Sequence, residues 1–433
     1  MQPRRYVQQL KGTAGDTITV DPAASQPVAT FKFENIEPKQ GSGWCYAEKI
    51  RLYISIDVNQ AGGAGVVIPP DQLYRCLASV KLTGSDFGQL YGPGDINGPA
   101  LGLIAQVVSN RYALPFPLRD NIAAANGDTV ATIPIDIPLA HRCFFKGHQT
   151  GIWNGFLRRD ALLDVTLAAG TVLAAFSPGA SFKTPCTVRA ELVYTVEPEA
   201  RPPVFWHWRT RSTPASETKH VIKNLCQGNG ITGVTGKGKI AFLAWLSNLA
   251  GLGGATSVDQ ITRVYPRDRG QGSHNLGTPF FGPSSFLYDF VEETRPMGIF
   301  GTGQGFAYPY QFGTQVNGSP NAATALFLPY FWPEVQGQQA SKLQEWSGDY
   351  YIEHDYAAVP AALGQWLSLE QSYLTQQQEE FLMGERMGLP SSVFKAFPKV
   401  DRPLHQVENA AAAAQQQQKL RGIPKKARPV RAT

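Results

Sequence analysis

The feature that most constrains the fold is a strict alternation of apolar and polar residues in several stretches. In residues 49–58, KIRLYISIDV, the residues that share one face of an extended chain are Ile50, Leu52, Ile54, Ile56 and Val58. The stretches 186–197 and 132–139 repeat this pattern, and Pro134 and Pro138 in the second predict either an edge strand or an interrupted pairing. Further strands are predicted at 29–35, 76–83 and 161–168. The sequence therefore predicts half-buried strands of antiparallel sheets.

The chain length and the number of Gly and Pro residues indicate that strands of this kind form two successive sandwiches. The chain has 433 residues, which is too long for one ordinary core, and its 43 Gly and 32 Pro suit short strands joined by tight turns and long loops. The first 200 residues predict one sandwich, which ends at the Pro-rich stretch 197–203. A second set of strand candidates follows, including residues 203–210, 239–246, 285–293 and 348–356.

The last part of the chain has a different pattern of apolar and polar residues. From 361 to 387, apolar residues recur at helical spacing, and they predict an amphipathic helix that carries Trp366, Leu367, Tyr373, Leu374 and Phe381 as a subunit interface. The alternative is that this stripe covers a sheet end. The predicted divisions are an N-terminal arm (1–28), a first sandwich (29–200), a second sandwich (201–360), the helix (361–390) and a tail (391–433).

The end of that tail concentrates positive charge. Residues 409–433 contain no acidic residue and six basic ones, namely Lys419, Arg421, Lys425, Lys426, Arg428 and Arg431. Without these six charges the formal net charge of the chain falls from +5 to −1. The tail predicts either a contact with a polyanion, such as nucleic acid or an anionic membrane, or a solubilising disordered end.

Targeting and cysteine patterns suggest no export. No apolar run is long enough for a membrane helix, and residues 1–12 lack the apolar stretch of a signal peptide. The cysteines are odd in number and widely spaced, at Cys45, Cys76, Cys143, Cys186 and Cys226. They predict buried free thiols of a protein made in the cytoplasm.

Several motifs resemble chemical sites but have a simpler interpretation. Gly228, Gly230 and Gly233 fit a dinucleotide loop, yet the following residues predict a strand where that loop requires a helix. His141, Cys143 and His148 do not make a complete set of zinc ligands. The aromatic runs 205–208 and 329–332 are more typical of a core or a subunit interface than of a binding site. We therefore expect no catalytic residue, no metal and no cofactor.

Two phrases carry a resemblance to a known family. CTVRAELVYTVEP (186–198) before the link, and FVEETRPMGIFGTGQG (290–305) before LQEWSGDYYIEHDY (343–356), look like parts of the double jelly-roll major capsid proteins of tailless membrane-containing bacteriophages and adenoviruses. The resemblance implies an all-β fold of two tandem antiparallel jelly rolls. The predicted C-terminal helix and flexible basic tail depart from the family, whose chains are expected to end shortly after the last strand. The resemblance also implies a homotrimer, a pseudo-hexagonal capsomer in an icosahedral virion shell, with other capsid proteins as partners.

Two other classes remain open from the sequence. A minor virion protein such as a penton or spike would share this composition. A carbohydrate-active β-sandwich enzyme would need two convergent carboxylates, for which Glu191, Asp289, Glu292 and Glu353 are candidates. Neither a small-molecule substrate nor a secreted location is expected.

Overall fold

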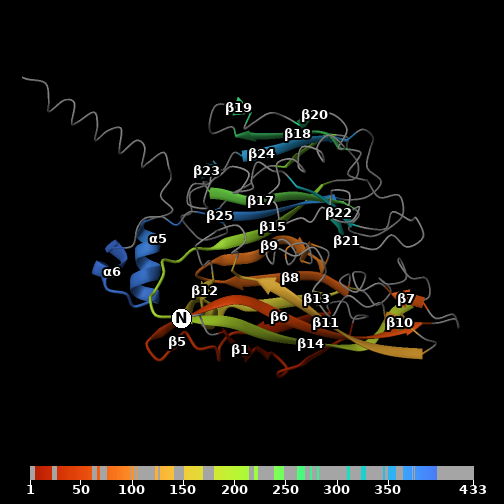
Figure 1. Cartoon of the computed structure of the whole chain (residues 1–433), viewed down its shortest axis with the longest axis horizontal. Coiled ribbons are helices and arrows are strands. Elements are labelled where there is room, and N and C mark those ends of the chain that lie inside the picture. Colours follow the sequence, from red (N-terminus) through yellow and green to blue (C-terminus); the bar gives the residue numbers. More distant parts are fainter. Residues whose placement is uncertain are drawn as a thin grey trace, which may run out of the picture.

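The chain forms two antiparallel β-sandwiches, one after the other, which lie side by side (Figure 1). The computed structural model describes residues 5–213 apart from gaps at 22–26, 61–65, 69–75, 99, 102–103, 105–121, 125–126, 141–150 and 169–179. Beyond residue 213 it describes the strands and helices given below, together with residues 374 and 387–390. Among all these residues, no helix is long and apolar enough to cross a membrane.

The first sandwich has four main strands in each sheet. One sheet has the order β1-β14-β6-β11, made of β1 (Arg5–Gln9), β6 (Gly43–Gln60), β11 (Gly127–Pro138) and β14 (Ala180–Glu197). The facing sheet has the order β4-β13-β8-β9, made of β4 (Val28–Lys32), β8 (Leu77–Gly84), β9 (Gly88–Ile96) and β13 (Leu162–Leu167). Smaller elements complete it: β2 (Lys11–Gly12), β3 (Ile18–Val20), β5 (Lys39–Gln40), β7 (Val66–Ile68), β10 (Ile122–Ala124), β12 (Ile152–Trp153) and helix α3 (Asn154–Asp160).

The second sandwich repeats this plan. Its first sheet has the order β15-β25-β17-β22, made of β15 (Trp206–Thr213), β17 (Gly238–Ser247), β22 (Ala323–Phe327) and β25 (Gly364–Ser372). Its second sheet has the order β16-β24-β18-β19, made of β16 (Lys219–Ile222), β18 (Ile261–Asp268), β19 (His274–Asn275) and β24 (Tyr350–Tyr356). The short strands β20 (Phe280–Phe281), β21 (Tyr310–Phe312) and β23 (Glu345–Trp346) pair with these.

The strand order identifies both sandwiches as jelly rolls. When the main strands of either sandwich are numbered along the chain, the two sheets have the orders 1-8-3-6 and 2-7-4-5. Two Greek keys folded into one sandwich produce this order. The two rolls share a sheet, because β9 and β15 join through a parallel bridge between Tyr91 and Trp208. The predicted all-β double jelly roll is therefore confirmed.

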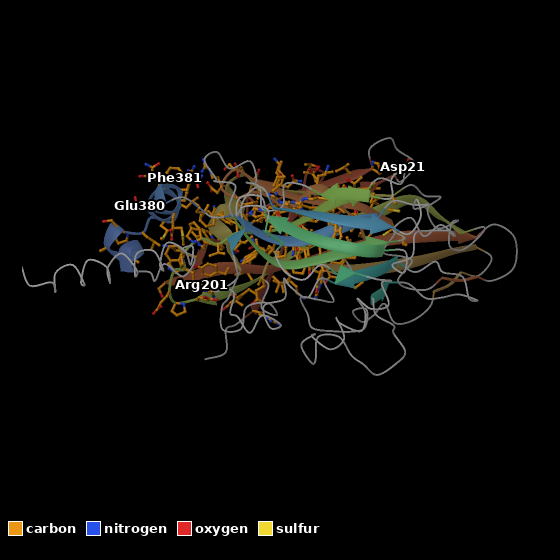
Figure 2. All side chains as sticks on the ribbon, turned by 90° about the horizontal axis from the view of Figure 1, so that it is seen from above. Asp21, Arg201, Glu380 and Phe381 are labelled. Carbon is orange, nitrogen blue, oxygen red and sulfur yellow. The ribbon has the colours of Figure 1, made fainter. Side chains whose placement is uncertain are left out.

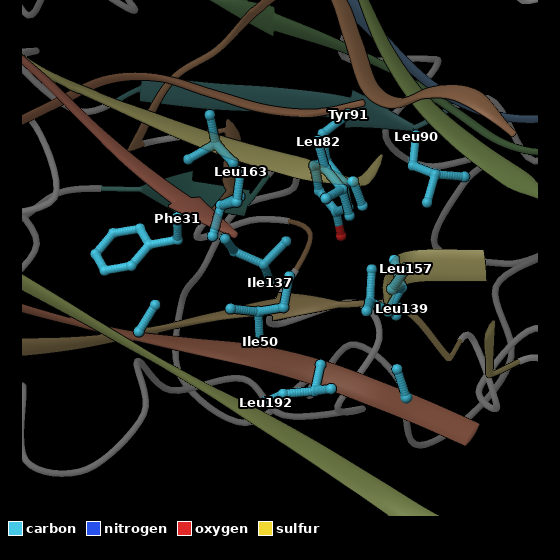
Figure 3. Packing of buried hydrophobic residues seen from close by; sticks show 14 of the residues in the cluster. Phe31, Ile50, Leu82, Leu90, Tyr91, Ile137, Leu139, Leu157, Leu163 and Leu192 are labelled. Carbon is cyan, nitrogen blue, oxygen red and sulfur yellow. The ribbon is translucent and has the colours of Figure 1, made fainter. Parts of the chain in front are cut away.

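The alternation seen in the sequence builds the core of the first roll. On β6, Ile50, Leu52, Ile54 and Ile56 are buried, and Ile50 pairs directly with Ile137 on β11 and with Leu192 on β14. Figure 3 shows these three side chains packing toward Leu82 and Leu163 of the opposite sheet. Each such side chain contributes about 1.5–3 kcal/mol when it is fully buried.

The edge strand predicted from two prolines is confirmed. Strand β11 is the last strand of its sheet, and it pairs with β6 through Pro134 opposite Tyr53 and Pro138 opposite Lys49. A proline cannot donate a backbone hydrogen bond, so an edge strand accommodates it where a central strand would not.

The prediction of one helix over 361–390 is wrong. Residues 364–372 form the central strand β25, and only afterwards come α5 (Gln376–Phe381), the π-helix η7 (Leu382–Arg386) and α6 (Ser391–Ala396). Strand β25 lies between β15 and β17, and both of its faces are buried from Gln365 to Glu370. A strand buried on both faces loses its apolar/polar alternation, so its sequence imitates a helical stripe.

The N-terminal arm also needs correction. Strands β1 and β3 both pair with β14, so residues within 1–28 are part of the first roll. Stacking of Tyr6 on Tyr194, with ring centroids 5.5 Å apart, fixes β1 against the sheet. The link between the rolls, residues 198–205, contains the predicted boundary between 200 and 201.

Candidate functional site

The residues predicted as a subunit-interface helix lie on separate elements. Trp366 and Leu367 lie on β25 and are 0% exposed, so neither side chain can contact another subunit. Leu374 is partly buried against the core, whereas Phe381 at the end of α5 is 46% exposed. Tyr373 lies outside the described residues. The six basic residues of the tail also lie outside them.

A chain of aromatic rings closes one end of the first roll, near the link between the rolls. The rings follow one another with centroid distances between 5.2 and 5.9 Å, in the order Trp44, Trp153, Phe156, Phe205 and Phe87. Phe205 belongs to the link, whereas Phe87 lies in the turn between β8 and β9. The 205–208 aromatic run is therefore core, as Trp206 and Trp208 are buried too.

Residues 376–389, which we name the C-terminal strap, return from the second roll to this end of the first. Leu382, Met383 and Met387 are buried in the apolar cluster that also contains the core residues of the first roll. Figure 2 shows Glu380 and Phe381 at the same end of the molecule as Arg201 of the link, with Asp21 far from them. Gly388, just after the π-helix η7, has a φ of 67° and so adopts the left-handed conformation that favours glycine at a helix end.

Asp86 joins the strap to the first roll. Its side chain is 4% exposed, and Oδ1 accepts hydrogen bonds from Arg159 Nη1 of α3 at 3.3 Å and from Arg386 Nε of the strap at 3.1 Å. Burial raises the pKa of Asp86, against the opposing effect of Arg159. A cavity of about 420 Å³ lies beside this contact, lined by Pro38, Asp86, Trp153, Gly155, Arg158, Arg159, Glu385 and Arg386.

A second ionic cluster is buried where the rolls join. Glu370 of β25 is 1% exposed and binds Arg211 of β15 through two hydrogen bonds of 2.6 and 3.1 Å. It also accepts a hydrogen bond from Ser368 and lies 3.6 Å from Arg209 Nη1. Burial alone would raise the pKa of Glu370, but Arg211 and Arg209 outweigh it and lower this pKa to about 2.

His207 lies beside this cluster and is also buried. Its Nδ1 is 2.8 Å from the carbonyl oxygen of Gln89 on β9, so the neutral ring donates a hydrogen bond to the neighbouring strand. Burial, together with the charge of Arg209, lowers the pKa of His207 to about 3. The side chain is therefore neutral at physiological pH.

The outer face of the β1-β14-β6-β11 sheet carries charged side chains that bind one another. Asp136 of β11 accepts from Lys49 at 2.5 Å and from Arg51 at 2.8 Å, both on β6. Burial alone would raise the pKa of Asp136, but Arg51 and Lys49 lower it overall. On β14, Glu191 pairs with Arg189 at 3.3 Å and accepts a hydrogen bond from Tyr53. These side chains are only partly exposed and already paired within the chain.

The carboxylates proposed for a carbohydrate-active enzyme do not form a described pair. Glu191 lies on β14 of the first roll, whereas Glu353 lies on β24 of the second. Asp289 and Glu292 lie outside the described residues. Within the described part of the chain, no group of His, Cys, Asp and Glu could hold a metal ion.

The other motifs are resolved in part. Strand β17 begins at Gly238, which confirms that a strand follows the glycine-rich stretch 228–237. That stretch itself lies outside the described residues, as do His141, Cys143 and His148. Cys45, Cys76 and Cys186 are free and buried, as predicted, and burial raises the pKa of Cys45 to about 11. Cys143 and Cys226 are not among the described residues.

The sequence carries a signal for the buried ionic cluster in the alternation of β15. In WHWRTRST (206–213), His207, Arg209 and Arg211 alternate with Trp206, Trp208 and Thr210, and so share one face of a strand. A partner carboxylate on a neighbouring strand follows from the cost of burying arginine alone. Asp86 had no comparable signal, because its two arginines lie 73 and 300 residues away.

Comparison with known proteins identifies similar structures but no similar sequence. No family model matches the chain, and no curated protein matches it. A structure of Sulfolobus Turreted Icosahedral Virus matches with 13% identity and a TM-score of 0.47, covering 96% of this chain and 99% of that chain. Major capsid protein P2 of bacteriophage PM2 matches with 10% identity and a TM-score of 0.36, covering 86% and 99%. The Faustovirus major capsid protein matches with 8% identity and a TM-score of 0.45, covering 86% and 89%.

Proposed function

We propose that this chain is a structural subunit of an icosahedral virus capsid. The observation that carries the proposal is the jelly-roll strand order, present twice in one chain with a shared sheet. Jelly rolls are wedge-shaped sandwiches that recur in capsid shells. Three copies of a chain with two wedges place six wedges around one axis, which makes a pseudo-hexagonal tile. This role requires no substrate, no cofactor and no catalytic group.

The outer sheet face of the first roll is suited to contact another copy. Lys49 and Arg51 both bind Asp136 there, and Glu191 binds Arg189, so each of these charges already has a partner when the face is covered. We place one contact of the trimer on this face. Other copies and other capsid proteins are then the partners, and the location is the virion shell.

We place the basic tail on the inner side of the shell. Helix α6 ends at Ala396 beside the strap, so the tail starts from the end of the molecule that carries α5 and α6 (Figure 1). The contents of a shell are polyanionic, either packaged genome or an anionic membrane leaflet. Lys419, Arg421, Lys425, Lys426, Arg428 and Arg431 would gain from either contact through counterion release.

Purified protein, or capsomers released gently from particles, should have the mass of three chains. The reason is that an obligate tile requires an interface well above the about 1,600 Å² of a standard complex. Sedimentation or light scattering across a dilution series measures this mass. A stable monomer at high concentration would contradict the trimer, and a low copy number per particle would favour a minor virion protein instead.

Deletion of residues 409–433 should leave the trimer intact but impair particle assembly or loosen the shell from its contents, more so at raised salt. A matched control deletes only the Ala/Gln run 410–418, which shortens the tail and keeps all six basic residues. Particle yield and retained nucleic acid or lipid measure the effect. Normal filled particles from the long deletion, or rapid loss of the tail from intact particles to added protease, would refute the inward placement.

A further inference from the structure

The C-terminal strap is the one described segment that leaves the second roll and packs on the first. Strand β25 ends at Ser372, and the strap begins at Gln376, so the strap follows β25 closely along the chain. The strap buries three large apolar side chains, those of Leu382, Met383 and Met387. That gain must offset the conformational entropy of ordering the whole strap, so its docking depends on further contacts.

The principal polar contact is the ion pair between Arg386 and Asp86. Arg386 also lies over the ring of Phe381, 4.7 Å from its centroid, so the side chain is held in place from within the strap. Asp86, in contrast, has a second partner that belongs to the first roll, since Arg159 lies on α3. If the strap departs, Asp86 keeps Arg159 and no buried carboxylate is left without a counter-ion. Release therefore avoids the largest penalty that normally locks a buried ion pair.

The packing around this ion pair also favours release. The open pocket of about 420 Å³ is lined by Glu385 and Arg386 of the strap together with Trp153 and Arg158, so the strap and α3 are not closely packed at this point. On the outer side, Phe381 and Glu385 are exposed. The strap therefore has an exposed side as well as a docked side, and Leu382, Met383, Met387 and Arg386 belong to the docked side.

We propose that the C-terminal strap is a releasable latch over the junction of the two rolls, with Asp86 as the residue that the latch engages. Asp86 adjoins Phe87, whose ring packs on Phe205 of the link. Docking of the strap thereby holds the turn between β8 and β9 against the link. Because the tail continues from α6, directly after the strap, a load on the tail acts on this latch. This inference concerns the single chain and does not depend on the capsid role.

Hydrogen exchange followed peptide by peptide tests the latch in the full chain. Arg386→Gln should speed exchange of the strap, residues 376–389, by about tenfold or more, because a charge-assisted hydrogen bond is lost. Exchange of α3 should stay unchanged, since Asp86 retains Arg159. The matched control is Glu385→Gln, which alters the neighbouring exposed residue and should change neither segment.

The complementary variants separate a latch from an ordinary piece of core. Arg159→Gln should speed exchange in α3 and leave the strap protected, whereas Asp86→Asn should loosen both. The proposal is overturned if Arg386→Gln leaves the strap as protected as before. It is equally overturned if Arg386→Gln speeds exchange of β6 and β14 together with the strap, because the strap would then be an inseparable part of the core.

Discussion

Replacing Glu370 with alanine is expected to destabilise the protein by about 3–5 kcal/mol, the cost of leaving a buried charge without its partner. Glu370 is 1% exposed, and its removal takes away the carboxylate that Arg209, which is 5% exposed, shares with Arg211, which is 16% exposed. Both arginines belong to β15, the strand that joins the second roll to the first.

Denaturant unfolding at fixed protein concentration measures this effect, because assembly would otherwise shift the midpoint. The matched control is Glu191→Ala on the outer sheet face, which removes a carboxylate that is paired with Arg189 but 20% exposed. That change should cost only about 0–1 kcal/mol, the range of surface ion pairs. Equal effects of the two substitutions would show that the cluster at β25 contributes no more than a surface pair.

The buried cluster and the strap show which parts of this structure the sequence can predict. Alternation on β6 and β14 predicts strands correctly because one face of that sheet is apolar and the other carries Arg51, Tyr53 and Glu191. Strand β25 defeats the same criterion, since Trp366 and Leu367 are both 0% exposed although they face opposite sides. Periodicity reports a contrast between core and solvent, and a strand without that contrast gives no signal.

The candidate sites follow the same division. The sequence locates the basic tail and the aromatic run 205–208 by composition alone. It does not predict the strap's place on the first roll, because that place depends on Asp86, 300 residues from Arg386. Contacts of this kind are fixed by the topology of the two rolls. Such contacts can be identified only once β25 is known to lie beside β15. The return of the strap to the end of the first roll that carries α3 must be known as well.

The stability of the chain should fall as the pH is lowered from about 6.5, and His207 should account for the first part of the loss. The folded-state pKa of His207 is about 3, because the ring is buried beside Arg209, whereas the unfolded side chain has its ordinary value of about 6.5. Between these values the unfolded chain binds a proton that the folded chain excludes. Stability is therefore fully present above about pH 6.5, and each pH unit below it costs up to about 1.4 kcal/mol.

Glu370 adds a second loss at lower pH, since its folded-state pKa is about 2 and its ordinary value is 4.5. Its contribution is present above pH 4.5 and disappears between pH 4.5 and 2, so the two residues act in different windows. Melting temperatures at pH 7.5, 6.0 and 5.0 therefore isolate His207. In His207→Asn an amide can still donate to the Gln89 carbonyl but does not titrate, and the slope between pH 6.5 and 5 should flatten. Glu370→Gln should keep most of the wild-type slope in that interval, because His207 remains buried. An unchanged slope in the asparagine variant would show that other groups cause the acid sensitivity.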